Sequence, residues 1–355
     1  MKVLIAGGGT GGHVIPALAI ARELRDKHAA EVRFVGTARG LETKLVPEAG
    51  FALELIHVGQ LKNVSLITRL RTVADLPLGV LRCISLLHSF KPSVVIGVGG
   101  YASGPAMMAA ILLRIPTVAF EPNAVPGLAN RLVGKYVSAA AVNFASTTSY
   151  FRNAKVTGIP VRSEFFQIAP KTIGPLRLLV FGGSQGARVL NEVVPRMAQR
   201  LLKKFPDLTI IHQCGGRNYD ATAQLYSGST RWDRVTVMRY LDAMVDEIAA
   251  ADLILCRSGA STVAELSAAG RASILVPFAA AADDHQRKNA EVFVAAGAAA
   301  MILEAEFTPE RALAEVTQLL SDPDVRQRMA EAARTLAHAT AAADIAQICL
   351  TLAKP

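Results

Sequence analysis

The sequence predicts an α/β protein built from two doubly wound parallel-sheet domains. Two separate stretches show the same order of strand, glycine-rich turn and helix, one starting at residues 2–6 and the other at 176–181. Short apolar runs that suit buried parallel strands then alternate with helical patterns in both halves. These runs cover residues 32–35, 94–98, 117–120, 209–213, 235–238, 253–256 and 273–276. We therefore expect two Rossmann-like domains that face a cleft, with ligands at the carboxyl ends of the strands.

The boundary between the domains is marked by proline and glycine. The glycine turn at 7–12 leads into a helical pattern in the first half, and the turn at 182–187 leads into one at 189–202. Between the halves, residues 158–161 and 170–175 have the Pro and Gly content of a linker. We place the domains at residues 1–163 and 164–339. We expect an Ala-rich C-terminal helix, about 340–355, to pack back on the first domain.

The composition excludes several classes of protein. The chain has 355 residues, 51% hydrophobic and 19% charged, which excludes a disordered chain. The two most lipophilic stretches, 73–90 and 105–120, are interrupted by charged residues and prolines, so neither provides the ~20 apolar residues of a spanning helix. The apolar run after Lys2 is too short for a secretion signal. Four widely spaced cysteines disfavour a zinc site and fit a reducing compartment, so we expect a cytosolic chain.

The basic charge is concentrated in the first half of the chain. Residues 1–163 contain 18 Lys and Arg against 8 Asp and Glu, a net charge of +10, and residues 164–355 contain 20 against 21. A one-sided basic domain indicates an anionic partner, either nucleic acid or an anionic membrane surface. A merely solvated basic face is the alternative interpretation of so moderate an excess.

Three glycine-rich loops, at 7–12, 97–105 and 182–187, follow predicted strands. The first matches the G-x-G-x-x-G dinucleotide fingerprint, which needs a carboxylate at the end of the second strand. Residues 36–39 read Gly-Thr-Ala-Arg and offer none, so an NAD-binding domain is the minor alternative. Three such turns at one cleft indicate a phosphate-bearing ligand, because glycine lets backbone amides approach a ligand closely.

His13 stands in the first turn of the helix that follows the first loop. A helix N-terminus disfavours imidazolium and so keeps the ring neutral at pH 7. A neutral imidazole beside a phosphate-lined cleft can take a proton from an attacking hydroxyl group. On chemistry alone, a general base and an ordinary polar residue near a helix start are equally good interpretations of His13.

Residues 252–265 read as a strand, a Ser-Gly turn and a helix. Arg257 and the free amides of the turn can hold a diphosphate. Glu265, about one helical turn further on, can accept hydrogen bonds from two ribose hydroxyls; a solvated helix carboxylate is the alternative. Asp322-Pro323-Asp324 has the form of a D-x-D metal motif, but no strand precedes it, so we favour helix capping there.

In combination these motifs resemble the MurG family. They are GGGTGGH at 7–13, GYASGP at 100–105, GGSQGAR at 182–188, RSGA at 257–260, Pro277-Phe278, DDHQ at 283–286 and Asn289. The similarity runs nearly end to end. It implies the glycosyltransferase B fold, with an N-terminal acceptor- and membrane-binding domain and a C-terminal UDP-GlcNAc-binding domain. It also implies inverting transfer of N-acetylglucosamine from UDP-GlcNAc to the C4 hydroxyl of the muramyl sugar of lipid I, giving lipid II for peptidoglycan synthesis.

The resemblance also implies a set of donor-binding residues. Glu265 holds the ribose, Arg257 and Ser184 hold the diphosphate, and the backbone near Leu241 contacts the uracil. Gln286, Asn289 and Ala264 contact the GlcNAc hydroxyls. The other positions matched to substrate binding are Thr10, Gly11, Gly12, Asn123, Arg162, Asn191, Ala260, Ser261, Thr262 and Val263.

On the acceptor side, the resemblance makes His13 the base. Gly100, Tyr101, Ser103 and Glu121 are matched to the acceptor region. The chain reads Phe-Glu-Pro-Asn at 120–123, where the family often has His-Glu-Gln-Asn. An acceptor contact or proton relay through that His or Gln therefore does not carry over, which favours His13.

The implied partners are UDP-GlcNAc, lipid I and an anionic membrane surface, with no cofactor, no metal and no nucleic acid. The implied location is peripheral, at the cytoplasmic face of the inner membrane. The glycine loops and helix N-termini can stabilise the departing UDP without a dedicated metal, and domain closure orders the site. Two alternatives stay open: a sugar transferase with another lipid acceptor such as diacylglycerol, and a non-catalytic nucleotide-sugar-binding membrane protein, which would not need His13.

Residues 61–92 combine apolar and basic side chains in a way that suits a membrane surface. The apolar set is Leu66, Ile67, Leu70, Val73, Leu78, Val80, Leu81, Ile84, Leu86 and Leu87. The basic set is Lys62, Arg69, Arg71, Arg82 and Lys91. Ordinary core helices with solvated basic residues are the alternative.

Overall fold

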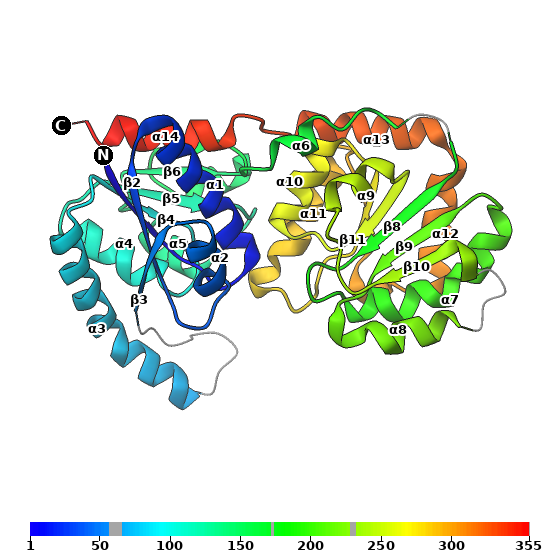
Figure 1. Ribbon diagram of the computed structural model, residues 1–355, viewed down its shortest axis with the longest axis horizontal. Helices are drawn as coiled ribbons and strands as arrows, with labels where there is room; N and C mark the ends of the chain where they lie inside the picture. Colours follow the sequence, from blue (N-terminus) through cyan, green and yellow to red (C-terminus); the bar gives the residue numbers. More distant parts are fainter. Residues whose placement is uncertain (57–65, 172–173, 228–231, 355) are drawn as a thin grey trace. The chain divides into compact units, whose positions relative to one another are not determined.

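The chain forms two compact α/β units (Figure 1). The computed structural model describes residues 1–56, 66–171, 174–227 and 232–354, and the side chains of all of these except 66–75 and 232. Unit 1 comprises Met1–Val161 with Thr340–Pro355, and unit 2 comprises Arg162–Ala339. This division lies two residues from the boundary expected at 163–164. The predicted fold class, two doubly wound parallel-sheet domains, is confirmed.

Unit 1 is built on a seven-stranded parallel sheet in the order β3-β2-β1-β4-β5-β6-β7. Its strands are β1 (Lys2–Ala6), β2 (Glu31–Gly36), β3 (Ala52–Leu55), β4 (Val94–Gly97), β5 (Thr117–Glu121), β6 (Ala139–Val142) and β7 (Ala154–Val156). Its helices are α1 (Gly11–His28), α2 (Glu42–Glu48), α3 (Leu66–Phe90), α4 (Ser103–Leu112), α5 (Leu128–Val133), the 3-10 helix η1 (Ala145–Tyr150) and α14 (Ala341–Leu352). Helix α14 packs against α1.

Unit 2 is built on a six-stranded parallel sheet in the order β10-β9-β8-β11-β12-β13. Its strands are β8 (Arg177–Phe181), β9 (Thr209–Gln213), β10 (Val235–Met238), β11 (Leu253–Cys256), β12 (Ser273–Leu275) and β13 (Ala300–Met301). Its α-helices are α6 (Ser163–Phe166), α7 (Arg188–Lys204), α8 (Tyr219–Tyr226), α9 (Met244–Ala250), α10 (Ala260–Ala269), α11 (His285–Ala295), α12 (Pro309–Ser321) and α13 (Pro323–Thr335). The 3-10 helices are η2 (Gly216–Asn218), η3 (Trp232–Arg234), η4 (Ala282–Asp284) and η5 (Glu304–Glu306).

Strand order places the candidate loops in both units. In unit 1, β1 pairs with β2 on one side and with β4 on the other, so the chain reverses direction across the sheet at β1. Unit 2 repeats this arrangement, with β8 between β9 and β11. The carboxyl ends of the two strands at such a switch point open a crevice, where ligands bind in doubly wound folds. The glycine-rich loops follow these strands.

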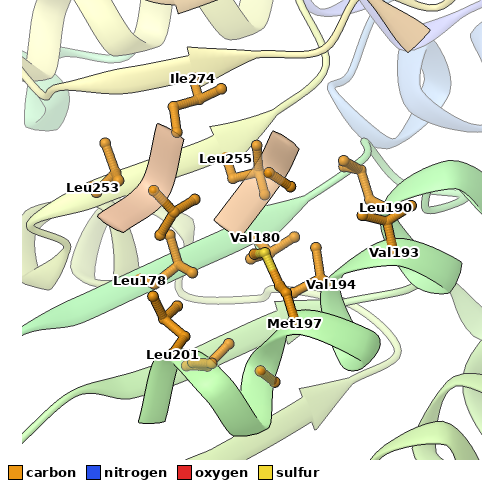
Figure 2. Packing of buried hydrophobic residues seen from close by; sticks show 14 of the residues in the cluster. Leu178, Val180, Leu190, Val193, Val194, Met197, Leu201, Leu253, Leu255 and Ile274 are labelled. Atoms are coloured by element: carbon orange, nitrogen blue, oxygen red, sulfur yellow. The ribbon is translucent and has the colours of Figure 1, made fainter. Parts of the chain in front are cut away.

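The core of unit 2 shows how the sequence pattern gives its layers (Figure 2). Leu178 and Val180 alternate along β8 toward one face of the sheet. The buried side chains of α7 recur at helical spacing and meet that face: Leu190, Val193, Val194, Met197 and Leu201. Truncating one such buried leucine to alanine typically costs ~2–5 kcal/mol. The loop that joins β8 to α7 is therefore anchored at both ends.

The burial of residues on α3 shows that part of the expected membrane surface is wrong. Val80 and Leu87 are 9% and 1% exposed and belong to the core of unit 1, where α3 packs against α4. Leu78 and Leu81 are 59% and 60% exposed, and Ile84 and Leu86 are partly buried. Lys62 lies outside the described residues, as do the side chains of Leu66, Ile67, Arg69, Leu70, Arg71 and Val73. No helix in the described part of the chain is long and apolar enough to cross a membrane.

Asp322 has the capping role preferred from the sequence. Its Oδ1 accepts a hydrogen bond from the Val325 amide at 3.0 Å, at the start of α13. Asp322 is therefore the N-cap of α13, the role that the sequence favoured over a D-x-D motif.

Candidate active site

Two glycine-rich loops of unit 1 pass against each other beyond β1 and β4. The Gly8 amide faces the Gly99 carbonyl oxygen at 3.4 Å. Gly100 has φ of 81°, and a Cβ at this position would overlap the Gly8 backbone. Only glycine allows the two loops to approach so closely. The two glycine-rich loops of unit 1 therefore meet in a backbone-to-backbone contact.

His13 lies at this crossing. It is partly buried in the first turn of α1, where its amide donates to the Thr10 carbonyl oxygen at 3.1 Å. Its Nδ1 lies 3.4 Å from Thr10 Oγ1. Its ring lies against Gly99, since a Cβ built there would come within 3.0 Å of His13 Nε2. The structure thus brings Thr10, His13 and the 99–101 loop together.

The other acceptor-side residues differ in accessibility. Tyr101 is 37% exposed and Ser103 is buried. Glu121 is 2% exposed, and its oxygens accept hydrogen bonds from Asn123, Gly127 and Asn130 at 3.0–3.1 Å. Burial raises the pKa of Glu121, and these hydrogen bonds oppose the rise. Glu121 therefore supports Asn123 from beneath and does not present its carboxylate at the surface.

Glu42 was not singled out from the sequence. It begins α2, is 1% exposed, and accepts a hydrogen bond from the Gly9 amide at 2.7 Å. A nucleotide-binding domain would have a carboxylate at the end of β2 for a ribose. Here the carboxylate comes from α2 and binds the loop itself.

In unit 2, the 182–187 loop follows β8 and rests on the backbone at Cys214 and Gly215. A Cβ on either Gly186 or Gly215 would overlap the opposing backbone. Ser184 is exposed on this loop. The loop is thus fixed from below while its tip stays accessible to a ligand.

Asn191 is buried beneath this loop, in a network that the sequence did not reveal. Its Nδ2 donates to the Cys214 carbonyl oxygen at 2.9 Å, and its Oδ1 lies 3.1 Å from His212 Nε2. His212 Nδ1 lies 2.7 Å from the Tyr226 hydroxyl. Burial lowers the pKa of His212 to about 3, so the ring is neutral and links two polar partners. Both ends of the Asn191 amide are thus bonded internally, and Asn191 holds the loop after β8 from within.

Arg257 has a different environment from the one expected of a diphosphate ligand. It is 7% exposed, and its Nη1 donates to the carbonyl oxygens of Val276 and Pro277 and to Glu304 Oε2, at 3.0–3.1 Å. Glu304 also accepts the Ala279 amide at 2.9 Å. Although burial raises the pKa of Glu304, these hydrogen bonds hold it below its ordinary value. Arg257 and Glu304 together fix the 276–279 segment, a structural role beside the diphosphate contact expected of Arg257.

Glu265 lies on α10, whose first residues form the core of the expected donor site. The first amides of an α-helix have no intrahelical partner. Val263 is fully buried, and its amide donates to the Gly259 carbonyl oxygen at 3.0 Å. The buried Ser261 Oγ has no hydrogen-bond partner within the described structure. Glu265 is partly buried, and burial raises its pKa to about 7 against the opposing effect of Arg162. Ala260, Thr262 and Ala264 lie on the same helical turns.

Gln286 and Asn289 tie α11 to the Ser-Gly turn. Gln286 Oε1 accepts the Phe278 amide at 3.0 Å, and its carbonyl oxygen accepts from Ser258 Oγ at 2.8 Å. Asn289 is fully buried and its Nδ2 donates to the Ser258 carbonyl oxygen at 3.2 Å. The structure therefore joins residues 257–265 to 276–289.

The expected uracil contact, Leu241, is buried, with 3% of the residue exposed. Next to it, a cleft of about 600 Å³ has Arg162 and Asp242 in its lining. Arg162 is exposed, with its guanidinium 5.0 Å from the Phe165 ring. Within the described residues, no three or more His, Cys, Asp or Glu side chains form a metal-binding group.

Comparison with known proteins extends over the whole chain. Residues 3–142 match the glycosyltransferase family 28 N-terminal domain, and residues 177–347 match the glycosyltransferase family 28 C-terminal domain. A relative from Anaeromyxobacter dehalogenans, strain 2CP-C, is 44% identical over 100% of this chain and 94% of its own length. It is named UDP-N-acetylglucosamine--N-acetylmuramyl-(pentapeptide) pyrophosphoryl-undecaprenol N-acetylglucosamine transferase.

Two further similarities agree with this one. A protein of the same name from Syntrophotalea carbinolica is 41% identical, with 98% of each chain covered. The crystal structure of Acinetobacter baumannii MurG superimposes with a TM-score of 0.83 at 30% identity, over 99% of each chain.

Proposed function

The chain belongs to the MurG family of glycosyltransferases, and on that premise we propose that it makes lipid II. It transfers N-acetylglucosamine from UDP-GlcNAc to the lipid-linked N-acetylmuramyl-pentapeptide, lipid I. The observation that carries this conclusion is the 44% identity along the entire chain, which includes both domains and the loops described above.

Unit 2 supplies the donor site in this proposal. The N-terminus of α10 and the exposed loop at Ser184 offer amides and hydroxyls to the diphosphate. Glu265 accepts the ribose hydroxyls, and the backbone at Leu241 contacts the uracil. Gln286 is held at the side of the 276–279 segment, where it contacts the sugar. Arg257 contributes positive charge while its Nη1 holds that segment in place.

Unit 1 supplies the base. The C4 hydroxyl oxygen of the muramyl sugar attacks the anomeric carbon from the face opposite UDP, and the bond to UDP breaks with its electrons leaving on the diphosphate. The imidazole of His13 takes the hydroxyl proton. Attack from the opposite face inverts the anomeric configuration. Loss of such a base typically lowers kcat by ~10²–10⁴-fold.

Membrane docking is the finer part of the proposal, and it is carried by α3 and α4. Leu78 and Leu81 on α3 and Leu112 on α4 are 59–67% exposed, on two helices that pack together. Arg82 and Arg114 are exposed close to them in the chain. Apolar side chains enter the interface while basic ones meet anionic headgroups, each worth about 1 kcal/mol near the surface.

The activity is tested by UDP release from UDP-GlcNAc with lipid I, with a diacylglycerol acceptor, and without acceptor. We expect UDP release only in the mixture that contains lipid I. Release with diacylglycerol but not with lipid I supports the alternative acceptor, and donor binding without release in any mixture supports the non-catalytic alternative.

Docking is tested by co-sedimentation with anionic vesicles at low and high salt. We expect Leu81→Glu to weaken binding, with Leu225→Glu, an exposed leucine of unit 2, as the matched control. Equal sedimentation of both variants with the wild type would place the docking surface elsewhere.

A further inference from the structure

The Glu42 carboxylate takes part in an arrangement that the reaction, as described so far, does not use. Its Oε2 accepts from the Gly9 amide at 2.7 Å. Its Oε1 accepts from the amide and the hydroxyl of Thr37 at 3.1 and 3.0 Å. With 1% exposure, it is a buried carboxylate joined to the loop after β1 and to the turn after β2.

Three glycines make room for this carboxylate. A Cβ at Gly8, Gly36 or Gly40 would overlap the Glu42 side chain. The carbonyl oxygen of Gly9 accepts from the Leu41 amide at 3.2 Å. Gly9 is therefore held at both its amide and its carbonyl by the start of α2, in a space that larger residues at the surrounding positions would close.

The position of this carboxylate is chemically informative. In a phosphate-binding glycine loop, amides such as that of Gly9 point at the ligand anion. Here the Gly9 amide already donates to the Glu42 carboxylate. A hydrogen bond to a carboxylate is stronger than one between two neutral groups. Gly9 therefore does not offer its amide to a phosphate of either substrate.

We propose that Glu42 is a positioning residue that fixes the loop carrying Thr10 and His13. The chain runs from Gly9 directly into Thr10, whose carbonyl oxygen accepts the amides of His13 and Val14 at 3.1 Å each. A displacement of Gly9 is therefore passed to the first turn of α1. A 1 Å misplacement of a reacting group can cost ~10²-fold in rate. The inference rests on the proposed role of His13 as the base.

The primary test compares Glu42→Gln with Glu48→Gln, an exposed glutamate on the same helix. Glutamine keeps the shape of the side chain but replaces one carboxylate oxygen by an NH2 group. This donor then faces either the Gly9 amide or the Thr37 amide and hydroxyl, which are donors too. We expect kcat to fall about 10–100-fold, the range for losing a hydrogen bond to a charged group. The Kd for UDP-GlcNAc, which unit 2 binds, should stay within about twofold of the wild type. Glu48→Gln should behave as the wild type.

A milder variant and a chemical rescue guard against misfolding. Thr37→Val keeps the side-chain shape and removes the hydroxyl donor to Glu42, and it should lower kcat about 3–10-fold at unchanged Kd. Glu42→Ala leaves the three donors facing a cavity, so sodium acetate should restore part of kcat where sodium chloride does not. Acetate should have no such effect on Glu48→Ala.

Two results would overturn the inference: an unchanged kcat in both Glu42→Gln and Thr37→Val, or a loss of donor affinity in the same proportion as kcat. The second would mean that the substitution disturbs donor binding as much as the step that His13 serves, which a positioning role toward His13 does not predict. A wild-type protein that releases no UDP with lipid I overturns the proposed function instead, so the two failures are distinguishable.

Discussion

Replacing Glu265 by glutamine should make the protein more stable at alkaline pH and leave its stability almost unchanged at acidic pH. Burial raises the pKa of this carboxyl from 4.5 to about 7 in the folded protein. The folded state therefore holds the proton more tightly than the unfolded state does. Below pH 4.5 both states are protonated, and no cost arises. Between pH 4.5 and 7 the unfolded state has released this proton while the folded state still holds it, so stability falls as pH rises.

The size of this effect follows from the two pKa values. A rise from 4.5 to about 7 corresponds to about 3 kcal/mol of folding free energy lost by pH 8. Glutamine does not titrate and escapes this loss. The advantage of Glu265→Gln over the wild type should therefore grow by about 3 kcal/mol between pH 4.5 and pH 8.

Urea unfolding at several pH values measures this difference, with fluorescence as the signal. Trp232 is the single tryptophan of the chain and belongs to unit 2, as Glu265 does. Glu306→Gln, at an exposed position of unit 2, is the matched control. A stability difference that is flat across this pH range would refute the reasoning, as would a wild type that gains on the variant at high pH.

The same carboxyl gives a second readout in the proposed function. Ribose hydroxyls donate to an ionised carboxylate more strongly than to a protonated one. The affinity for UDP-GlcNAc should therefore rise as pH increases through 7 in the wild type and stay level in Glu265→Gln. Calorimetric titration at pH 6 and 8 measures both.

Three further predictions concern other groups of the candidate site. His13→Ala should lower kcat ~10²–10⁴-fold with the Kd for UDP-GlcNAc unchanged, measured by steady-state kinetics and calorimetry; near-normal kcat would assign the proton to another group. Arg257→Ala and Glu304→Gln should each lower the free energy of unfolding by roughly 3 kcal/mol and reduce kcat/KM for the donor. The double variant should lose much less than the sum of the two, whereas additive losses would show that the pair is not coupled. Burial lowers the pKa of His212 to about 3, so its contribution to stability is complete above pH 6.5 and is lost as pH falls toward 3. In urea unfolding, His212→Asn should therefore lose less stability than the wild type between pH 6.5 and 3; an equal loss in both would exclude His212 as the source.

The parts of the fold that the sequence predicts are those with strong local signals. The strands at 209–213, 235–238 and 253–256 are found with the expected bounds, because buried parallel strands are continuous apolar runs. Strand β6 was missed, since its Ala-Ala-Ala-Val sequence carries little of the β-branched signal of a strand. The two-residue β13 gives no pattern at all.

In the candidate site, too, the residues with local sequence signals were predicted and those without them were not. The glycine loops and His13 were found from local spacing. The partners that hold them were not, because each comes from a distant part of the chain: Glu42 reaches Gly9 across 33 positions, and Glu304 reaches Arg257 across 47. Such contacts depend on how strands align and leave no periodic trace. The glycines shortly before Glu42, at 36 and 40, are a local hint of its burial.

Unit 1 is assembled from two stretches of chain that a ribosome makes at different times. Helix α14, at residues 341–352, packs against α1, and the whole of unit 2 is encoded between them (Figure 1). Unit 2 has 178 residues, from 162 to 339, and takes roughly 9–36 s to synthesise at common elongation rates. During that interval, the surface of α1 that α14 covers is uncovered on the nascent chain. The domain begun first is therefore completed last, and unit 2 can fold while its neighbour still lacks its final helix.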